Sequence, residues 1–254
     1  IPVPPLPVQE EIVRILDQYS AAEQELETQL DAELEARITQ YEYYREILID
    51  NSADNNLKTL GEIAIDMYRG SGIKRNQITL TGIPCVRYGE IYTTYNLWFD
   101  RCISHTDEEI IPNKKYFEHS DILFAITGEK VDEIGKSCAY IGNDKCLAGG
   151  DIVVMKHKEN PKYLAYALST KDAQRQKSQG RIKSKVVHTS VPALKAVKIP
   201  IPRVEKQERI VSILDMFDQL VNDLKQGLLA EISARRKQYE YYRDKLLTFK
   251  EKQP

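Results

Sequence analysis

The stretch Gln40–Leu48 reads QYEYYREIL, and the stretch Gln238–Leu246 reads QYEYYRDKL. Seven of the nine letters are identical, although the two stretches lie 198 positions apart. The same offset relates Ile1–Leu48 to Ile199–Leu246 without insertion or deletion. Because one lost residue rotates everything after it in a helix by about 100°, this uninterrupted repeat predicts a helix whose register matters.

Both repeated segments carry apolar residues at helical spacing. Steps of three and four residues connect these positions from Ile12 to Leu48 and again from Ile210 to Leu246. At 1.5 Å per residue each helix would be about 60 Å long, which favours a coiled coil over an ordinary globular helix. The seam residues that we select from this pattern are Leu16, Leu26, Leu30, Tyr41, Tyr44, Leu48, Leu214, Leu224, Leu228, Tyr239, Tyr242 and Leu246.

The repeated tyrosines have two interpretations. They can pack in the coiled coil with their hydroxyls at its edge, or they can bind a partner protein. Packing is the commoner use of aromatic residues at helical spacing. The sequence leaves both interpretations open.

Charge is divided unevenly along the 254 residues, whose formal net charge is −2. Residues 9–50 carry −9, residues 51–202 carry +5 and residues 203–254 carry +2. An acidic helix pairs favourably with a more basic one. The two long helices are therefore expected to pack against each other.

The middle of the chain has a different pattern, with short apolar runs separated by glycines. The runs, which predict strands, cover residues 61–65, 83–86, 121–126, 138–141 and 151–155. Residues 161–178 predict one helix that begins at a proline. The expected fold class is α+β: two long helices at residues 1–50 and 203–254 flank a strand-rich globular domain at 51–202.

No catalytic pattern emerges from the sequence. Gly128–Ser137 ends in Gly-Lys-Ser, but six residues separate its glycines where a phosphate-binding loop has four, so a turn between two strands is expected. The four histidines lack metal-ligand spacing, and the four cysteines form no CxxC pair, which is typical of thiols in a reducing cytosol. No apolar run is long enough to span a membrane. We expect a cytoplasmic protein without catalytic residues, metal or cofactor.

Basic and polar residues supply the remaining signal. Residues 171–198 carry a local charge of +7, and two further loops contribute donors, as expected for contacts to nucleic-acid phosphates and base edges. Arg87 and Lys74 are the candidates for base edges, and residues 181–185 are the candidates for phosphates. The complete set of candidate DNA-binding residues is Arg69, Ser71, Lys74, Arg75, Arg87, Tyr88, Lys130, Arg181, Lys183, Ser184 and Lys185.

Four stretches resemble a known family. IPIPRVEKQERIVSILDMFDQL (residues 199–220) resembles the junction that follows a target recognition domain in the DNA-specificity subunit of type I restriction-modification enzymes. GIPCVRYGEIYTTYN (82–96), DILFAITGEKVDEIGKSCAYIGNDKCLAGGDIVVM (121–155) and GRIKSKVVHTSVPALKAVKIPIP (180–202) resemble the body and end of such a domain. The order of helix, recognition domain and helix also matches over nearly the whole chain.

The resemblance implies a non-catalytic subunit that reads one half of a bipartite double-stranded DNA target for DNA methylation and prokaryotic defence. It also implies partners: DNA methyltransferase subunits and, in the full complex, the restriction subunit. In that family the two conserved helices form an antiparallel coiled coil, which acts as a spacer between two recognition domains, and the resemblance implies the same for residues 1–50 and 203–254. This chain departs from the pattern, because it has one such domain, and Ile1–Pro7 resembles the tail of another. A C-terminal part of a longer subunit and a half-subunit that forms a homodimer through its helices are both consistent with this.

Two alternative functions remain. The coiled coil could be the functional part of a protein-interaction scaffold whose α+β domain binds protein. The chain could also be the recognition segment of a fused methyltransferase-nuclease. Salt-dependent binding to duplex DNA distinguishes a DNA-recognition subunit from the scaffold. The length of the full open reading frame distinguishes it from the fused methyltransferase-nuclease.

Overall fold

The computed structural model describes residues 3–50, 56–178, 181–183 and 186–248. The chain divides into two compact units. The helical unit consists of residues 1–43 and 215–254, and the globular unit consists of residues 44–214. Two long helices, α1 (Leu6–Asp50) and α7 (Val204–Leu247), contribute residues to both units.

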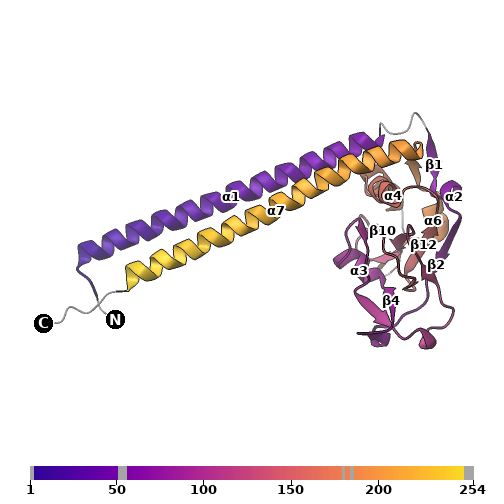
Figure 1. Cartoon of the computed structure of the whole chain (residues 1–254), viewed down its shortest axis with the longest axis horizontal. Coiled ribbons are helices and arrows are strands. Elements are labelled where there is room, and N and C mark those ends of the chain that lie inside the picture. Colours follow the sequence, from indigo (N-terminus) through magenta and orange to yellow (C-terminus); the bar gives the residue numbers. More distant parts are fainter. Residues whose placement is uncertain (1–2, 51–55, 179–180, 184–185, 249–254) are drawn as a thin grey trace. The chain divides into compact units, whose positions relative to one another are not determined.

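In the helical unit, α1 and α7 lie side by side (Figure 1). The ring of Tyr19 stacks on that of Tyr242 with 5.5 Å between centroids. The Arg236 guanidinium lies 3.8 Å from a carboxylate oxygen of Glu23 and 3.5 Å from one of Glu27. Because residue numbers rise along one helix as they fall along the other, the helices are antiparallel. The expected packing of an acidic helix on a more basic one is confirmed.

The selected seam residues differ in burial. Tyr41 and Leu214 are buried, and Tyr44 is 38% exposed. The other nine seam residues are partly buried: Leu16, Leu26, Leu30, Leu48, Leu224, Leu228, Tyr239, Tyr242 and Leu246. The middle tyrosines of the two repeated phrases, Tyr43 and Tyr241, are 62% and 60% exposed. The tyrosines are thus divided between packed and exposed positions.

The described residues of the globular unit form many short strands, several short α-helices and two 3-10 helical turns, η1 (Arg75–Gln77) and η2 (Glu108–Ile110). Its strands are β1 (Leu57–Thr59), β2 (Asp66–Arg69), β3 (Ile78–Thr79), β4 (Ile83–Val86), β5 (Trp98–Phe99), β6 (Ser104–Thr106), β7 (Tyr116–Phe117), β8 (Ile122–Ala125), β9 (Thr127–Gly128), β10 (Ser137–Tyr140), β11 (Cys146–Ala148), β12 (Ile152–Lys156), β13 (Arg181–Lys183), β14 (Val186–His188) and β15 (Lys198–Pro200). Its helices are α2 (Leu60–Ile63), α3 (Tyr88–Thr93), α4 (Pro161–Leu168), α5 (Lys171–Lys177) and α6 (Val191–Lys195). The predicted α+β class is confirmed.

Two five-stranded sheets position the core of this unit. One has the order β2-β12-β8-β10-β5 and the other β3-β6-β4-β11-β7, and smaller sheets pair β13-β14-β9 and β1-β15. Phe99, Phe117 and Tyr140 meet in the core, where the Tyr140 ring centroid lies 5.0 Å from that of Phe117 and 5.1 Å from that of Phe99. Apolar side chains from both large sheets belong to this one cluster.

Four of the five predicted strand runs are confirmed, as β4, β8, β10 and β12. The prediction for residues 61–65 is wrong, because Leu60–Ile63 forms α2. Thr59 and Glu62 cap the first turn reciprocally: Thr59 N–H donates to the Glu62 carboxylate at 2.6 Å, and Glu62 N–H donates to Thr59 Oγ1 at 3.2 Å. This capping box stabilises a helical turn despite the apolar alternation of the run.

The prediction of one helix over residues 161–178 is also wrong in part. Two helices, α4 and α5, occupy this stretch. Thr170 has extended backbone angles, and its hydroxyl accepts a hydrogen bond from Ala173 N–H at 3.3 Å. A hydroxyl that caps a new first turn therefore ends the earlier helix. The segment between Gly128 and Ser137 connects β9 to β10, as predicted.

Within the described residues, no helix combines the length and the apolar character needed to cross a membrane.

Candidate nucleic-acid interface

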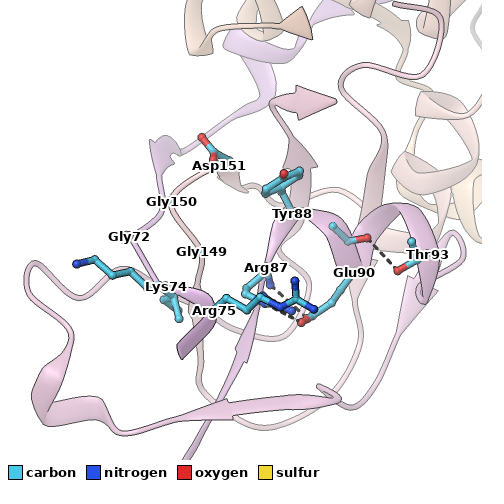
Figure 2. A pocket seen from close by; sticks show the side chains of 12 residues that line it. Gly72, Lys74, Arg75, Arg87, Tyr88, Glu90, Thr93, Gly149, Gly150 and Asp151 are labelled. Atoms are coloured by element: carbon cyan, nitrogen blue, oxygen red, sulfur yellow. Dashed lines mark hydrogen bonds and ion pairs between the residues drawn. The ribbon is translucent and has the colours of Figure 1, made fainter. Parts of the chain in front are cut away.

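An open cavity of about 620 Å³ lies on the globular unit (Figure 2). Three segments line it: residues 72–75 after β2, residues 87–90 and 93 in and just before α3, and residues 149–151 between β11 and β12. Four candidate residues from the sequence lie in its wall, namely Lys74, Arg75, Arg87 and Tyr88. The sheets thus bring together two loops that the sequence separates.

Close backbone packing holds these segments in place. Gly149 N–H donates to Val86 O at 2.8 Å, and Ser71 N–H donates to Ala148 O at 2.8 Å. A Cβ atom on Gly149 would lie 2.8 Å from Val86 O, and one on Gly70 would lie 2.2 Å from Gly149 O. Glycine is required at both positions because a side chain would push these segments apart.

Arg87 follows β4 and is the N-terminal capping residue of α3. Its Nε donates to Glu90 Oε1 at 3.3 Å, and its backbone N–H donates to Glu90 Oε2 at 3.2 Å; Figure 2 shows both residues in the cavity wall. The Arg87 side chain is 33% exposed, whereas that of Glu90 is 7% exposed. The arginine therefore faces the cavity while its carboxylate partner lies beneath it.

Other donors surround this pair. Lys74, Arg75 and Tyr88 are exposed, and neither Lys74 nor Arg75 has a carboxylate partner among the described residues. The backbone of this segment is fixed by a hydrogen bond that the Lys74 backbone N–H donates to Gln77 Oε1 at 2.8 Å. Unpaired cations beside an arginine and a phenol suit an anionic ligand that also has planar, hydrogen-bonding groups.

Three other candidate residues lie outside the wall of the cavity. The Arg69 guanidinium lies 2.5 Å from an Asp151 carboxylate oxygen and also donates to Gly150 O. Ser71 is buried, and its hydroxyl donates to Asn113 O at 2.6 Å. Lys130 is exposed and pairs with Glu133 at 2.8 Å. Arg69 and Ser71 support the loops around the cavity in this conformation, whereas Lys130 projects from the β9–β10 connection.

The basic segment forms part of a separate sheet. Arg181 and Lys183 belong to β13, which pairs with β14, and β14 pairs with β9 next to Lys130 in the chain. Thr127 Oγ1 and His188 Nδ1 lie 3.1 Å apart across this pairing. Ser184 and Lys185 lie outside the described residues.

Sequence reasoning missed two acids in the cavity wall: Glu90, which pairs with Arg87, and Asp151, which pairs with Arg69 outside the wall. Glu90 could have been found from its spacing, since an acid three residues after a capping position is typical of a capping box. Asp151 lies 82 positions from Arg69, so only the pairing of β2 with β12 reveals their contact.

The fold and the cavity define a modular α+β protein, in which one strand-rich domain is inserted between two long helices. A comparison with family models assigns residues 1–36 and 54–234 to the "Type I restriction modification DNA specificity domain". The chain belongs to this family. The resemblance drawn from its sequence is therefore confirmed.

Curated relatives agree with the family assignment. The specificity subunit of the EcoR124I/EcoR124II type I restriction enzyme of Escherichia coli is 32% identical over 96% of this chain and 60% of its own length. A putative type I specificity subunit of Haemophilus influenzae, S.HindORF215P, is 34% identical over 98% of this chain and 63% of its own length. The chain thus spans about three fifths of the length of these relatives.

A solved structure shows the same fold. It comes from a study of complex assembly and conformational transition in a type I restriction-modification system. The two chains superpose with a TM-score of 0.75 at 19% identity, and the match covers 97% of this chain and 60% of the other.

Proposed function

We propose that the protein is the non-catalytic DNA-recognition subunit of a type I restriction-modification system, and that its globular unit reads one half of a bipartite target. The observation that carries this proposal is the cavity with Lys74, Arg75, Arg87 and Tyr88 in its wall. It presents Arg75, a cation suited to a phosphate, beside Arg87 and Lys74, which can contact base edges, and these are the two kinds of contact that sequence-specific DNA binding needs. Such a protein works in the cytoplasm of a prokaryotic cell, where its DNA lies.

In this proposal one surface contacts base edges and a second surface contacts phosphates. Arg87 and Lys74 contact base edges, since arginine binds the O6 and N7 atoms of guanine with two hydrogen bonds. Residues 181–185 contact phosphates, since the segment 171–198 carries a local charge of +7. Tyr88 and Arg75 border the same cavity and complete the contact surface.

The phosphate role predicts the behaviour of Lys183→Ala. The substitution should weaken binding to all duplex sequences alike and flatten the slope of log affinity against log salt by about one unit, since one phosphate contact is lost. Fluorescence anisotropy on two unrelated duplexes over a salt series measures this slope.

Lys158→Ala provides a matched control for that measurement. Lys158 is exposed in the connection from β12 to α4, so this variant loses the same charge outside the basic segment. An equal change of slope in both variants, or none in Lys183→Ala, would exclude the assignment of phosphates to residues 181–185.

The helical unit acts in this proposal as the spacer on which methyltransferase subunits assemble, and these subunits recruit the restriction subunit in the full complex. The antiparallel pair of helices supports a fixed distance between two half-sites, because α1 with its 45 residues is about 68 Å long at 1.5 Å per residue. A rigid spacer of this kind determines which separation of half-sites can be read.

The two long helices begin with the same local structure, which supports a homodimer in which both helix starts bind a globular unit. Gln207 Nε2 donates to Pro202 O at 2.9 Å, and Gln9 Nε2 donates to Pro4 O at 2.7 Å, at the same offset of 198. In the globular unit, Gln207 also accepts a hydrogen bond from Asn160 N–H at 3.0 Å, so it attaches α7 to this unit.

The start of α1 repeats the sequence of the start of α7 but is more exposed. Val13 is 56% exposed, whereas Val211 at the repeated position is 8% exposed. In the proposal the globular unit of a second copy covers the start of α1, as Asn160 and its neighbours cover that of α7. Light scattering of the purified protein should give twice the 29.2 kDa of one chain, and a mass of one chain would contradict the homodimer.

A further inference from the structure

The carboxylate of Glu90 is buried beneath the cavity and is held from two sides. Its Oε1 accepts hydrogen bonds from Ser104 Oγ at 2.7 Å and from Arg87 Nε at 3.3 Å. Its Oε2 accepts one from the Arg87 backbone N–H at 3.2 Å. Ser104 reaches it because β6 pairs with β4, with Ser104 opposite Cys85. A buried carboxylate needs such compensation for its lost hydration, and this one has partners on both oxygens.

Only one edge of the Arg87 guanidinium is used in this arrangement. Nε is bound to Glu90, while Nη1 and Nη2 have no partner among the residues that the structure describes. These two groups form the end of the side chain that can donate to guanine O6 and N7 together. The fixed edge lies toward the protein, so the free end is left for a ligand in the cavity.

We propose that Glu90 is a positioning residue, which holds Arg87 in one orientation for a base edge and prevents it from acting as a general phosphate contact. This inference rests on the proposed function of the cavity. An exposed arginine loses rotamer freedom when it binds, and a residue that fixes it beforehand reduces that loss for the matching base.

The pairing with Glu90 also offsets the charge of Arg87. A guanidinium paired with a carboxylate at 3.3 Å forms a pair with no net charge, which attracts phosphates less than a free guanidinium does. Arg75 offers the contrast within the same cavity, because it is exposed and has no carboxylate partner among the described residues. Glu90 thus separates a base-reading arginine from a phosphate-binding one.

The variant Glu90→Gln tests this inference, since it keeps the shape of the side chain and removes its charge. At the base pair that Arg87 contacts, the preference of the protein should fall about 5- to 10-fold. Affinity for unrelated duplexes should rise, and its salt slope should become steeper by up to about one unit, because a guanidinium without its carboxylate can bind a phosphate. A purely structural residue would not change preference and salt slope in opposite directions.

Two further variants separate positioning from helix capping. Glu62→Gln is the matched control, because Glu62 closes the capping box of α2 with Thr59 and no arginine takes part in that box. It should lower stability without changing preference. In an Arg87→Ala background, Glu90→Gln should cause no further loss of preference, since a residue that acts through Arg87 has no effect once Arg87 is gone.

The measurement uses the full-length protein with its cognate methyltransferase subunit, on the preferred duplex and on duplexes changed at one base pair. Fluorescence of Trp98, the one tryptophan, verifies the fold. If Glu90→Gln is unfolded, Ser104→Ala takes its place, because it removes one bond to the same carboxylate and should reduce preference about 2- to 5-fold. Unchanged preference in a folded variant overturns the inference alone, whereas a wild-type protein without any preference overturns the proposed function and the inference together.

Discussion

Arg87→Ala is expected to reduce the preference of the protein for one base pair about 10- to 100-fold, because a good two-bonded contact between an arginine and a base contributes about 1–3 kcal/mol of discrimination. The loss should be confined to one position of the half-site. Affinity for unrelated duplexes should change little, since the charge of Arg87 is already paired with Glu90 at 3.3 Å. Competition binding with duplexes that carry all four base pairs at each position measures the effect.

Arg14→Ala is the control for this prediction. Arg14 also pairs with an acid three residues away, Glu11 at 2.6 Å, but it lies on α1 in the helical unit. Its loss should leave the preference intact. A uniform loss of affinity in Arg87→Ala, with every position still read, would show that Arg87 contacts the DNA backbone.

Lys177→Met is expected to stabilise the protein at neutral pH. Lys177 ends α5 with 3% of its surface exposed, and its Nζ donates to Leu168 O at 2.9 Å. Burial lowers the pKa of Lys177 from 10.5 to about 7, which corresponds to about 5 kcal/mol at about 1.4 kcal/mol per pKa unit. The variant loses a hydrogen bond of about 1–2 kcal/mol, so we expect a net gain of about 3 kcal/mol and a melting temperature about 5–10 °C higher.

The sign of the pH dependence distinguishes this prediction from a simple packing effect. Between about pH 7 and 10.5 the unfolded chain keeps the Lys177 proton and the folded chain does not, so this residue makes the wild-type protein more stable as pH rises. Below pH 7 the full penalty applies. The advantage of Lys177→Met should therefore be fully present below about pH 7, decrease as pH rises and disappear toward pH 10.5.

Unfolding followed by Trp98 fluorescence measures this difference for the globular unit. Burial raises the pKa of Cys85 to about 12 and also raises that of Tyr95, but both residues are present in both proteins and cancel in the comparison. Lys171→Met, an exposed position at the start of the same helix, should change neither stability nor its pH dependence. A constant difference between wild type and Lys177→Met from pH 7 to 10.5 would mean that Lys177 keeps an ordinary pKa.

Periodicity was sufficient to predict the long helices, because helical spacing persists over more than ten turns and the repeat preserves register. The strands β8, β10 and β12 were equally accessible, since each is a short apolar run bounded by polar residues or glycine. The two errors have a common cause. Thr59 and Thr170 cap helices with their side chains, and such single local contacts outweigh the periodicity of a few residues.

The candidate site could be predicted only in pieces. Residue type identified Lys74, Arg75, Arg87 and Tyr88, and the cavity joins them. Their proximity depends on the pairing of β4 with β11 and on the close approach at Gly149, which no spacing along the chain encodes. For Ser71 the residue type was misleading. A serine between two glycines is typical of a binding loop, but this one is buried and its hydroxyl donates to Asn113 O.

The most direct test of DNA recognition is a selection from randomised duplexes, performed with the full-length protein and its cognate methyltransferase subunit, followed by sequencing of the bound fraction. We expect enrichment of one short half-site of about three to five base pairs, with a mirrored second copy at a fixed distance if two chains assemble through their helices. Binding that is neither enriched for a sequence nor weakened by salt would overturn the proposed DNA recognition and would favour a protein-interaction scaffold instead.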